Sequence, residues 1–256
     1  MNTPKTTALV TGASAGIGAE FCRQLADRCD VIIATGRRLE PLQKLAEDLA
    51  DKCELHCVVA DLATREGRTR VIESLRQKGP VDYLVNNAGF STLGPVESTD
   101  IDSQQAMVDV HITATLALTR AAVPFMRERR KEHGGEGAVI NVSSLASFGP
   151  VPGAAVYAAT KAFLNTFSES LAKELADTGI HVQSLCPGYT RSEFHDREEM
   201  AAFDRAMVPD DQWMNAPELV AASLTALDGG PVVFVPGEAN VELARRGIQR
   251  ALKNMV

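Results

Sequence analysis

Short apolar, β-branched runs alternate along the chain with longer stretches in which apolar residues recur every three or four positions. The short runs predict buried strands, and the longer stretches predict helices. A long helical pattern runs from about Asp102 to Arg130, and the last from about Ala239 to Lys253. The expected strands are Thr6–Gly12, Val31–Gly36, Leu55–Asp61, Val81–Gly89, Gly137–Ser144, His181–Gly188 and Val232–Gly237.

This alternation predicts an α/β fold in which seven parallel strands carry helices on both faces. We expect one doubly wound domain over residues 1–256. The stretch from Tyr189 to Pro217 lacks a clear element and is long for a connection, which is typical of a substrate lid. Its apolar residues suit either a pocket wall or core contacts: Phe194, Met200, Phe203, Met207, Trp213 and Met214.

The formal net charge of −7 over 256 residues disfavours a surface for nucleic acid or anionic membranes. The basic run Arg127–His133 is interpreted as the solvated end of a helix, with a polyanion site as the alternative. The first residues lack the apolar core of a signal peptide, and no apolar run reaches the ~20 residues of a membrane span. We therefore expect a cytoplasmic protein.

The chain has five cysteines. Because this number is odd and the chain is not small, no disulfide framework is predicted. Cys53, His56 and Cys57 raise the alternative of a metal site. They lie in or beside an expected strand, where successive side chains point to opposite faces. Reduced, buried thiols and no metal are therefore expected.

A glycine-rich turn, TGASAGIG, joins the first strand to the first helix at Thr11–Gly18. Glycines in this position allow a tight turn and bring phosphate close to the backbone at a helix N-terminus. The spacing is G-x-x-x-G-x-G rather than G-x-G-x-x-G, and a purely structural turn is the alternative. The residues expected to bind a dinucleotide here are Gly12, Ser14, Ala15, Gly16, Ile17 and Gly18.

The end of the second strand favours NADP(H) over NAD(H). A site for NAD(H) needs a carboxylate here for the ribose 2′-hydroxyl, but no carboxylate occurs before Glu40. Arg37 and Arg38 stand there instead, and guanidinium groups pair well with a 2′-phosphate. The alternative is that both arginines form a solvated helix start.

The remaining strand ends carry further candidate residues. Asp61, followed by Leu62, could accept a hydrogen bond from an adenine amino group. The carboxyl ends of strands in a doubly wound sheet are where ligands bind, so we expect these segments to converge there. They contribute Asn87, Ala88 and Gly89 after the fourth strand, Ser144 after the fifth, and Pro187 and Gly188 after the sixth.

Tyr157 and Lys161 lie four residues apart, so they share one face of the expected helix. A neighbouring ammonium favours the phenolate and is expected to lower the pKa of Tyr157. Such a phenol can exchange protons with a substrate. Ser144 can hydrogen-bond a carbonyl oxygen as charge develops on it.

These motifs together resemble the short-chain dehydrogenase/reductase family, in its form of about 250 residues, over nearly the whole chain. TGASAGIG matches TGxxxGxG, NNAG at Asn86–Gly89 is unaltered, and Ser144, Tyr157 and Lys161 match S…YxxxK. The resemblance implies a Rossmann-like fold with Tyr157 as general acid/base, Lys161 binding the nicotinamide ribose and Ser144 binding the substrate oxygen. It places Thr190 and Ser192 at the cofactor's carboxamide, Ser192 replacing the usual threonine.

His111 is the main departure from that family. An asparagine that holds a proton-relay water next to the lysine is usual at this position. Imidazole can donate and accept hydrogen bonds, so His111 is a hypothetical relay residue. The alternative is a buried histidine with no part in catalysis.

The resemblance implies an oxidoreductase that acts on a small alcohol or carbonyl compound. A medium-sized hydrophobic carbonyl substrate is expected. A cofactor-binding protein with little turnover, in a sensing or scaffolding role, is the alternative, and His111 is the feature that favours it. The apolar faces of the two longest helices predict a homodimer or homotetramer.

Overall fold

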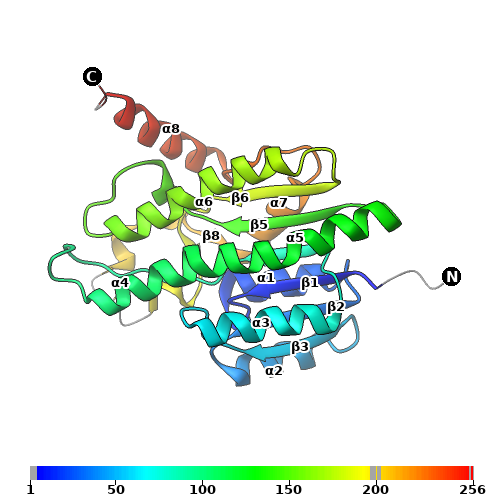
Figure 1. Ribbon diagram of the computed structural model, residues 1–256. Coiled ribbons are helices and arrows are strands. Elements are labelled where there is room, and N and C mark those ends of the chain that lie inside the picture. Colours follow the sequence, from blue (N-terminus) through cyan, green and yellow to red (C-terminus); the bar gives the residue numbers. More distant parts are fainter. Residues whose placement is uncertain (1–4, 197–199, 201–202, 254, 256) are drawn as a thin grey trace.

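A computed structural model describes residues 5–196, 200, 203–253 and 255. It forms a single α/β domain whose seven-stranded sheet has the order β3-β2-β1-β4-β5-β6-β9, with every pair parallel (Figure 1). The doubly wound fold predicted above is confirmed. The strands of this sheet are β1 Thr7–Thr11, β2 Val31–Gly36, β3 Glu54–Val59, β4 Tyr83–Asn86, β5 Gly137–Val142, β6 Ile180–Leu185 and β9 Val233–Phe234.

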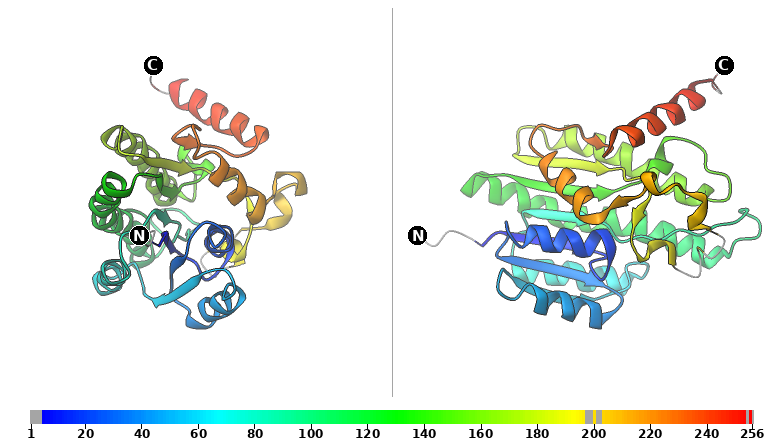
Figure 2. Two further views of the ribbon diagram at one scale, coloured as in Figure 1. Left: turned by 90° about the vertical axis from the view of Figure 1, so that its right-hand side faces the viewer. Right: turned by 180° about the vertical axis from the view of Figure 1, so that it is seen from behind.

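Helices cover both faces of this sheet, as crossover connections between parallel strands require (Figure 2). The C-terminal helix α8 projects from the body of the domain (Figures 1 and 2). The helices are α1 Gly16–Leu25, α2 Leu39–Asp48, α3 Arg65–Lys78, α4 Ile101–Val108, α5 Ala114–His133, α6 Ala155–Glu174, α7 Ala216–Thr225 and α8 Glu238–Lys253.

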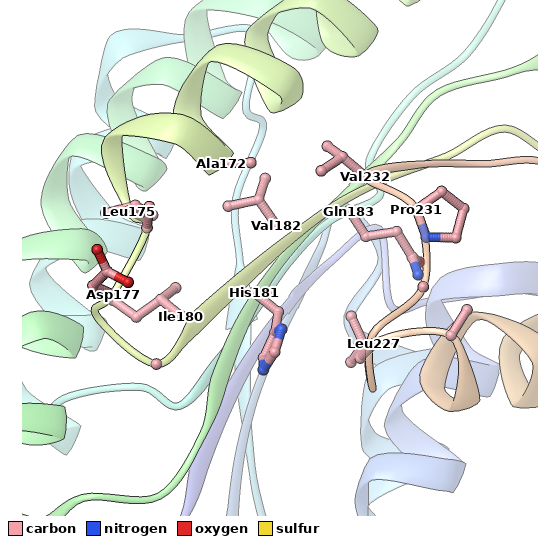
Figure 3. A pocket seen from close by; sticks show the side chains of 14 residues that line it. Ala172, Leu175, Asp177, Ile180, His181, Val182, Gln183, Leu227, Pro231 and Val232 are labelled. Atoms are coloured by element: carbon pink, nitrogen blue, oxygen red, sulfur yellow. The ribbon is translucent and has the colours of Figure 1, made fainter.

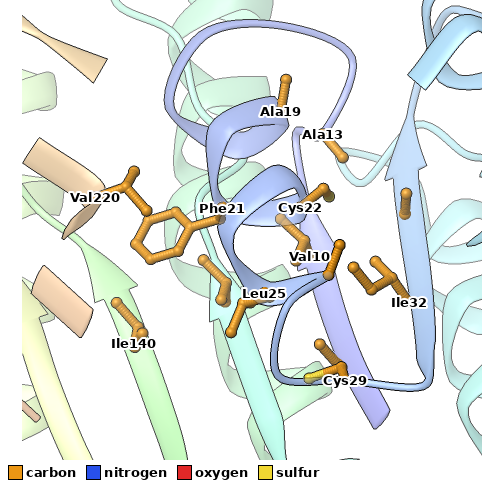
Figure 4. Close-up of a cluster of buried hydrophobic side chains, with 14 of the residues drawn as sticks. Val10, Ala13, Ala19, Phe21, Cys22, Leu25, Cys29, Ile32, Ile140 and Val220 are labelled. Carbon is orange, nitrogen blue, oxygen red and sulfur yellow. The ribbon is translucent and has the colours of Figure 1, made fainter. Parts of the chain in front are cut away.

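Two apolar layers fill the space between the sheet and its helices. On one face, Phe21 and Leu25 of α1 lie between Ile32 and Ile140 of the sheet and Val220 of α7 (Figure 4). On the other face, the layer joins α3, α5 and α6 to the strands. Because both faces are covered, the central strands β1 and β5 are buried along their whole length.

The stretch from Asp102 to Arg130, expected as one helix, is interrupted by a π-helical turn at Asp109–Thr113, which carries His111. Such insertions of an extra residue are frequent at functional sites. Among the described residues, Ile101–His133 contains an 18-residue stretch of mean hydropathy 1.2, and so has the length and apolar composition of a membrane span. Its α5 part contacts α3, β4 and β5 and buries Leu118 and Ala122, so it is a core helix of the domain.

The stretch expected as a lid contains short elements. Strands β7 Thr190–Arg191 and β8 Met214–Asn215 pair in parallel as a second, two-stranded sheet. The single turns η3 Glu193–Asp196, η5 Arg205–Met207 and η6 Asp210–Gln212 lie between them. Residues 197–199 and 201–202 of the expected lid lie outside the described residues.

The interpretation of the basic run as a solvated helix end is wrong for two of its residues. Arg129 and Arg130 turn inward and bind the buried carboxylate of Asp82. The same carboxylate accepts a hydrogen bond from the backbone N–H of Thr7 at 2.8 Å. The end of α5 is thereby fixed to the amino ends of β1 and β4.

Candidate active site

Thr11, the last residue of β1, connects the two strand ends at the centre of the site. Its hydroxyl accepts hydrogen bonds from the backbone N–H groups of Asn87 and Ala88, both at 2.9 Å, and donates to the carbonyl of Val85 at 3.2 Å. The side-chain amide of Asn87 in turn donates to the backbone carbonyl of Thr11 at 2.8 Å. The glycine-rich turn and the Asn87–Gly89 loop are therefore held side by side, as expected.

The glycine-rich turn has the geometry of a phosphate cradle. Gly12 and Gly16 have φ of +67° and +54°, a region that side chains other than glycine rarely adopt. Ala15 precedes α1 without a capping side chain, and no acidic residue lies in the first turn. The backbone N–H groups at this end of α1 are therefore suited to an anion. Ser14 and Ile17 occupy the same turn, partly exposed.

The expected catalytic residues meet between β5 and α6. Tyr157 forms a hydrogen bond with Ser144, which ends the loop from β5. The ammonium nitrogen of Lys161 lies 5.5 Å from the centroid of the Tyr157 ring and donates to the carbonyl of Val142 at 2.8 Å. The hydroxyl of Ser143 donates to the carbonyl of Lys161 at 2.8 Å, which anchors α6 to β5.

Burial controls the proton affinities of this pair. It raises the pKa of Tyr157 to about 12, and the hydrogen bond from Ser144 opposes this only in part. Burial also lowers the pKa of Lys161 to about 7. The expectation that Lys161 lowers the pKa of Tyr157 is therefore wrong for this structure, because desolvation penalises both charged forms.

His111 has partners at both ring nitrogens. The backbone N–H of Phe90 donates to Nε2 at 3.2 Å, and Nδ1 lies 2.8 Å from the hydroxyl of Thr160. That hydroxyl donates to the carbonyl of Tyr157 at 2.8 Å, so it accepts from a protonated Nδ1. Burial and the nearby Lys161 hold the pKa of His111 well below 6.5. A neutral, fully bonded ring argues against the relay hypothesis.

The other expected cofactor residues lie along the same edge of the sheet. The backbone of Gly36 packs against Ser14, which places Arg37 and Arg38 beside the glycine-rich turn. Both arginines are exposed, and Arg38 pairs with Glu193 at 2.7 Å. Asp61 is exposed and Leu62 buried after β3.

The loop after β6 completes the edge. Pro187 accepts a hydrogen bond from the backbone N–H of Leu145, next to Ser144, at 3.0 Å. The hydroxyl of Thr190 donates to the carbonyl of Gly188 at 3.2 Å, and that of Ser192 to the carbonyl of Thr190 at 3.4 Å. Ser192 faces Gly16, so this loop lies over the glycine-rich turn.

Two hollows on the protein lie outside this arrangement. A pocket of about 260 Å³ at the amino ends of β6 and β9 includes Asp177 and His181 (Figure 3) and shares no residue with the site. A groove of about 650 Å³ between α8 and α6 is lined mainly by apolar residues. The groove begins at Ser147, three residues after Ser144, but contains none of the catalytic residues.

Sequence reasoning did not identify two residues that shape the site. Thr11 lies inside the recognised motif, yet its role depends on β1 and β4 being adjacent. Thr160 links His111 to Tyr157 only because α6 packs against the π-helical turn. For Phe194 the sequence leaves a pocket wall and a core contact open, and its ring centroid lies 6.2 Å from that of Tyr157. None of these contacts has a signal in the local sequence.

Comparison with known proteins agrees with this geometry. The model of the short chain dehydrogenase family matches residues 6–201. The chain is 35% identical over 188 residues to sulfoacetaldehyde reductase 2 of Chromohalobacter salexigens, a match that covers 73% of each chain. It is 36% identical over 182 residues to the NADP-dependent 3-hydroxy acid dehydrogenase YdfG of Escherichia coli O6:H1, covering 70% of this chain and 71% of that one.

Solved structures are similar over almost the whole chain. A short-chain dehydrogenase from Sphingobium yanoikuyae in complex with NADPH gives a TM-score of 0.82 at 30% identity, covering 98% of this chain and 96% of that one. The bulky-bulky ketone specific alcohol dehydrogenase from Comamonas testosteroni gives a TM-score of 0.76 at 29% identity. This match covers 98% of this chain and 95% of that one. A fold and site of this kind define a nucleotide-dependent oxidoreductase. The chain belongs to the short-chain dehydrogenase/reductase family.

Proposed function

We propose that this protein is an NADP(H)-preferring oxidoreductase that interconverts an alcohol and a carbonyl compound, with Tyr157 as general acid/base. The observation that carries the proposal is the contact of Tyr157 with Ser144 and Lys161 at the carboxyl edge of the sheet, beside the glycine-rich turn. A phenol held between a hydroxyl and an amine is suited to proton exchange with a substrate oxygen.

In the direction of carbonyl reduction, Ser144 donates a hydrogen bond to the substrate oxygen and stabilises the charge that develops there. Tyr157 then gives its phenolic proton to that oxygen, while Lys161 is the residue that would hold the nicotinamide ribose. When bound, a nicotinamide would supply the hydride that reduces the carbonyl carbon. The pKa of about 12 suits Tyr157 to hold its proton until the substrate oxygen becomes basic.

Two observations support the preference for NADP(H). No carboxylate is present at the end of β2 before Glu40, whereas Arg37 and Arg38 are exposed there. A similar structure was solved with NADPH, and one relative is named NADP-dependent. A 3-ketoacyl-(acyl-carrier-protein) reductase from Brucella melitensis, 25% identical to this chain, was solved with NADH. The two arginines are what favours the phosphorylated cofactor for this chain.

A medium-sized hydrophobic carbonyl compound is the proposed substrate class. Phe194 lies beside Tyr157 and continues into an aromatic cluster formed by Tyr189, His195, Phe203 and Trp213. Such a wall favours apolar substituents on the carbonyl carbon. The name of the Comamonas testosteroni enzyme, specific for bulky-bulky ketones, is consistent with this class.

The test is NADPH oxidation with a panel of hydrophobic ketones and aldehydes by the wild type and by Tyr157→Phe. The variant is expected to lose turnover by about 10²–10⁴-fold, the range for a lost general acid, while it binds NADPH as the wild type does. If the wild type bound NADPH tightly but turned over no member of the panel, the cofactor-binding alternative would replace this proposal.

The proposal extends to assembly and location. Leu116 and Phe125 of α5 are 42% and 40% exposed, which suits burial between subunits of a homodimer or homotetramer. Sedimentation at low protein concentration tests this, with a monomer as the contrary result. A cytoplasmic location remains the expectation, and the five cysteines are free thiols, as that compartment favours.

A further inference from the structure

Three consecutive residues of the segment after β6 contact three separate parts of the proposed cofactor and substrate site. Ser192 packs against Gly16 in the glycine-rich turn. Glu193 forms an ion pair with Arg38, at 2.7 Å between Oε2 and Nη2. Phe194 lies beside Tyr157, with 6.2 Å between ring centroids. The phosphate cradle, Arg38 and the substrate wall are therefore connected through adjacent residues of one segment.

The partner of Arg38 is the unexpected part of this arrangement. Arg38 is the residue proposed to bind the 2′-phosphate of the cofactor, and in the structure its guanidinium holds a carboxylate instead. Both side chains are more than half exposed, at 54% and 61%. An exposed ion pair contributes little stability, so another anion can readily take the place of the carboxylate. A 2′-phosphate carries about −1.5 to −2 charges against −1 for Glu193, and guanidinium binds phosphate in a bidentate manner.

We propose that Glu193 occupies the place of the 2′-phosphate on Arg38, and that a 2′-phosphorylated adenosine displaces it. The displacement moves Phe194 and so adjusts the wall beside Tyr157 when the phosphorylated cofactor binds. This inference rests on the proposed preference for NADP(H). Glu193 is thus a specificity-determining residue that acts through Arg38, not a catalytic one.

Calorimetric titration with adenosine 2′,5′-bisphosphate tests the competition, with adenosine 5′-monophosphate as the probe that lacks the 2′-phosphate. Glu193→Gln is expected to raise the affinity for the bisphosphate about three- to tenfold at low ionic strength. Its affinity for the monophosphate stays unchanged. This gain in affinity is expected to decrease with added salt, because exposed charges are screened. In an Arg38→Ala background, Glu193→Gln gives no gain.

The matched control is Asp210→Asn. Asp210 pairs with Arg191 at 2.8 Å on the same segment, also exposed, but it does not contact Arg38. An equal gain in this control, or an equal gain for the monophosphate, would show a general charge effect and overturn the inference. If Arg38→Ala weakens bisphosphate binding while Glu193→Gln changes nothing, the competition is refuted and the NADP(H) preference stands. If Arg38→Ala also has no effect, the role of Arg38 in the NADP(H) proposal fails with it.

Trp213 reports on the transmitted movement. It is the single tryptophan of the sequence, and its ring lies 5.2 Å from that of His195, which lies 5.2 Å from Phe194. The bisphosphate, but not the monophosphate, is expected to change its fluorescence and its quenching by acrylamide. Glu193→Gln should show much of that change without ligand. Identical wild-type fluorescence with both probes would overturn the transmission to Phe194.

Discussion

At the residue scale, Lys161 is the residue whose burial has the clearest consequence. Only 4% of it is exposed, and it donates to the backbone carbonyl of Val142. Its pKa of about 7 means that the folded protein holds this proton far less tightly than the unfolded chain does. Proton binding by Lys161 is therefore linked to folding.

The variant Lys161→Met is expected to remove this linkage. Between pH 7 and about 10.5 the unfolded state binds the extra proton, so the stability of the wild type rises with pH in that window. Below pH 7 both states are protonated, and the cost of burying the ammonium is fully present. Relative to the variant, the free energy of unfolding of the wild type should rise by about 2 kcal/mol between pH 7 and pH 9. Urea unfolding at several pH values measures this, and a constant difference would contradict it.

His111 is interpreted as a positioning residue, since its ring joins the backbone of Phe90 to Thr160 and hence to the carbonyl of Tyr157. The shorter side chain of His111→Asn cannot reach both partners. We expect kcat to fall about tenfold through displacement of Tyr157. The shape of the pH–rate profile should not change between pH 6 and 9, because the ring, with its pKa well below 6.5, is already neutral there. An altered profile would instead support the relay hypothesis.

At the scale of elements, the junction of β1 with β4 and β2 offers a matched pair of hydroxyls. Thr11 and Thr35 are partners in register on adjacent strands, and both are buried. The Thr11 hydroxyl makes three hydrogen bonds to the backbone of β4 and its loop. The Thr35 hydroxyl has no hydrogen-bond partner among the described residues.

The two threonines should therefore respond differently to replacement by valine, which keeps their shape. Thr11→Val leaves two backbone N–H groups without an acceptor and should lower the free energy of unfolding by about 2–3 kcal/mol. It should also weaken NADPH binding, because the loop at Asn87 loosens. Thr35→Val should be neutral or stabilising. Urea denaturation and calorimetry on both variants check this, and equal losses would refute the assignment.

At the scale of the whole molecule, the two edges of the sheet have separate roles. The loops of the candidate active site gather at the carboxyl edge, whereas the amino edge holds the buried group of Asp82, Arg129 and Arg130. Arg129 also donates to the carbonyl of Lys5 at 2.8 Å, and Arg130 to the carbonyl of Glu136. This group joins the start of the chain, β4, the end of α5 and the approach to β5.

Asp82→Asn is expected to lower stability by about 3–5 kcal/mol, because two buried guanidinium groups lose their counter-charge. The turnover number of the folded fraction should be unchanged, since the site lies at the other edge. The control is Asp27→Asn, which breaks the exposed pair with Lys52 and should cost at most about 1 kcal/mol. Thermal unfolding and kinetics at low temperature measure both quantities. If the turnover number of the folded Asp82→Asn protein also fell, the two edges would be linked and the prediction would be wrong.

The fold class and most of the candidate site can be predicted from the sequence. Strand and helix periodicities differ and alternate along this chain, and that alternation restricts the topology to a parallel, doubly wound sheet. Its ligand edge then follows from the carboxyl ends of the strands. Ser144, Tyr157 and Lys161 could be grouped because a strand end and a helical i, i+4 spacing are both local signals.

The partners of the buried and charged residues, by contrast, depend on how the elements pack together. Arg129 and Arg130 look solvated in a basic run, but Asp82 lies opposite them only when β4 and α5 pack together. The contact of His111, in the π-helical turn, with Thr160 likewise joins residues far apart in sequence. The same is true of the ion pair between Arg38 and Glu193. Burial reversed the expected pKa shift of Tyr157, because desolvation depends on every atom around a group and not on its sequence neighbours.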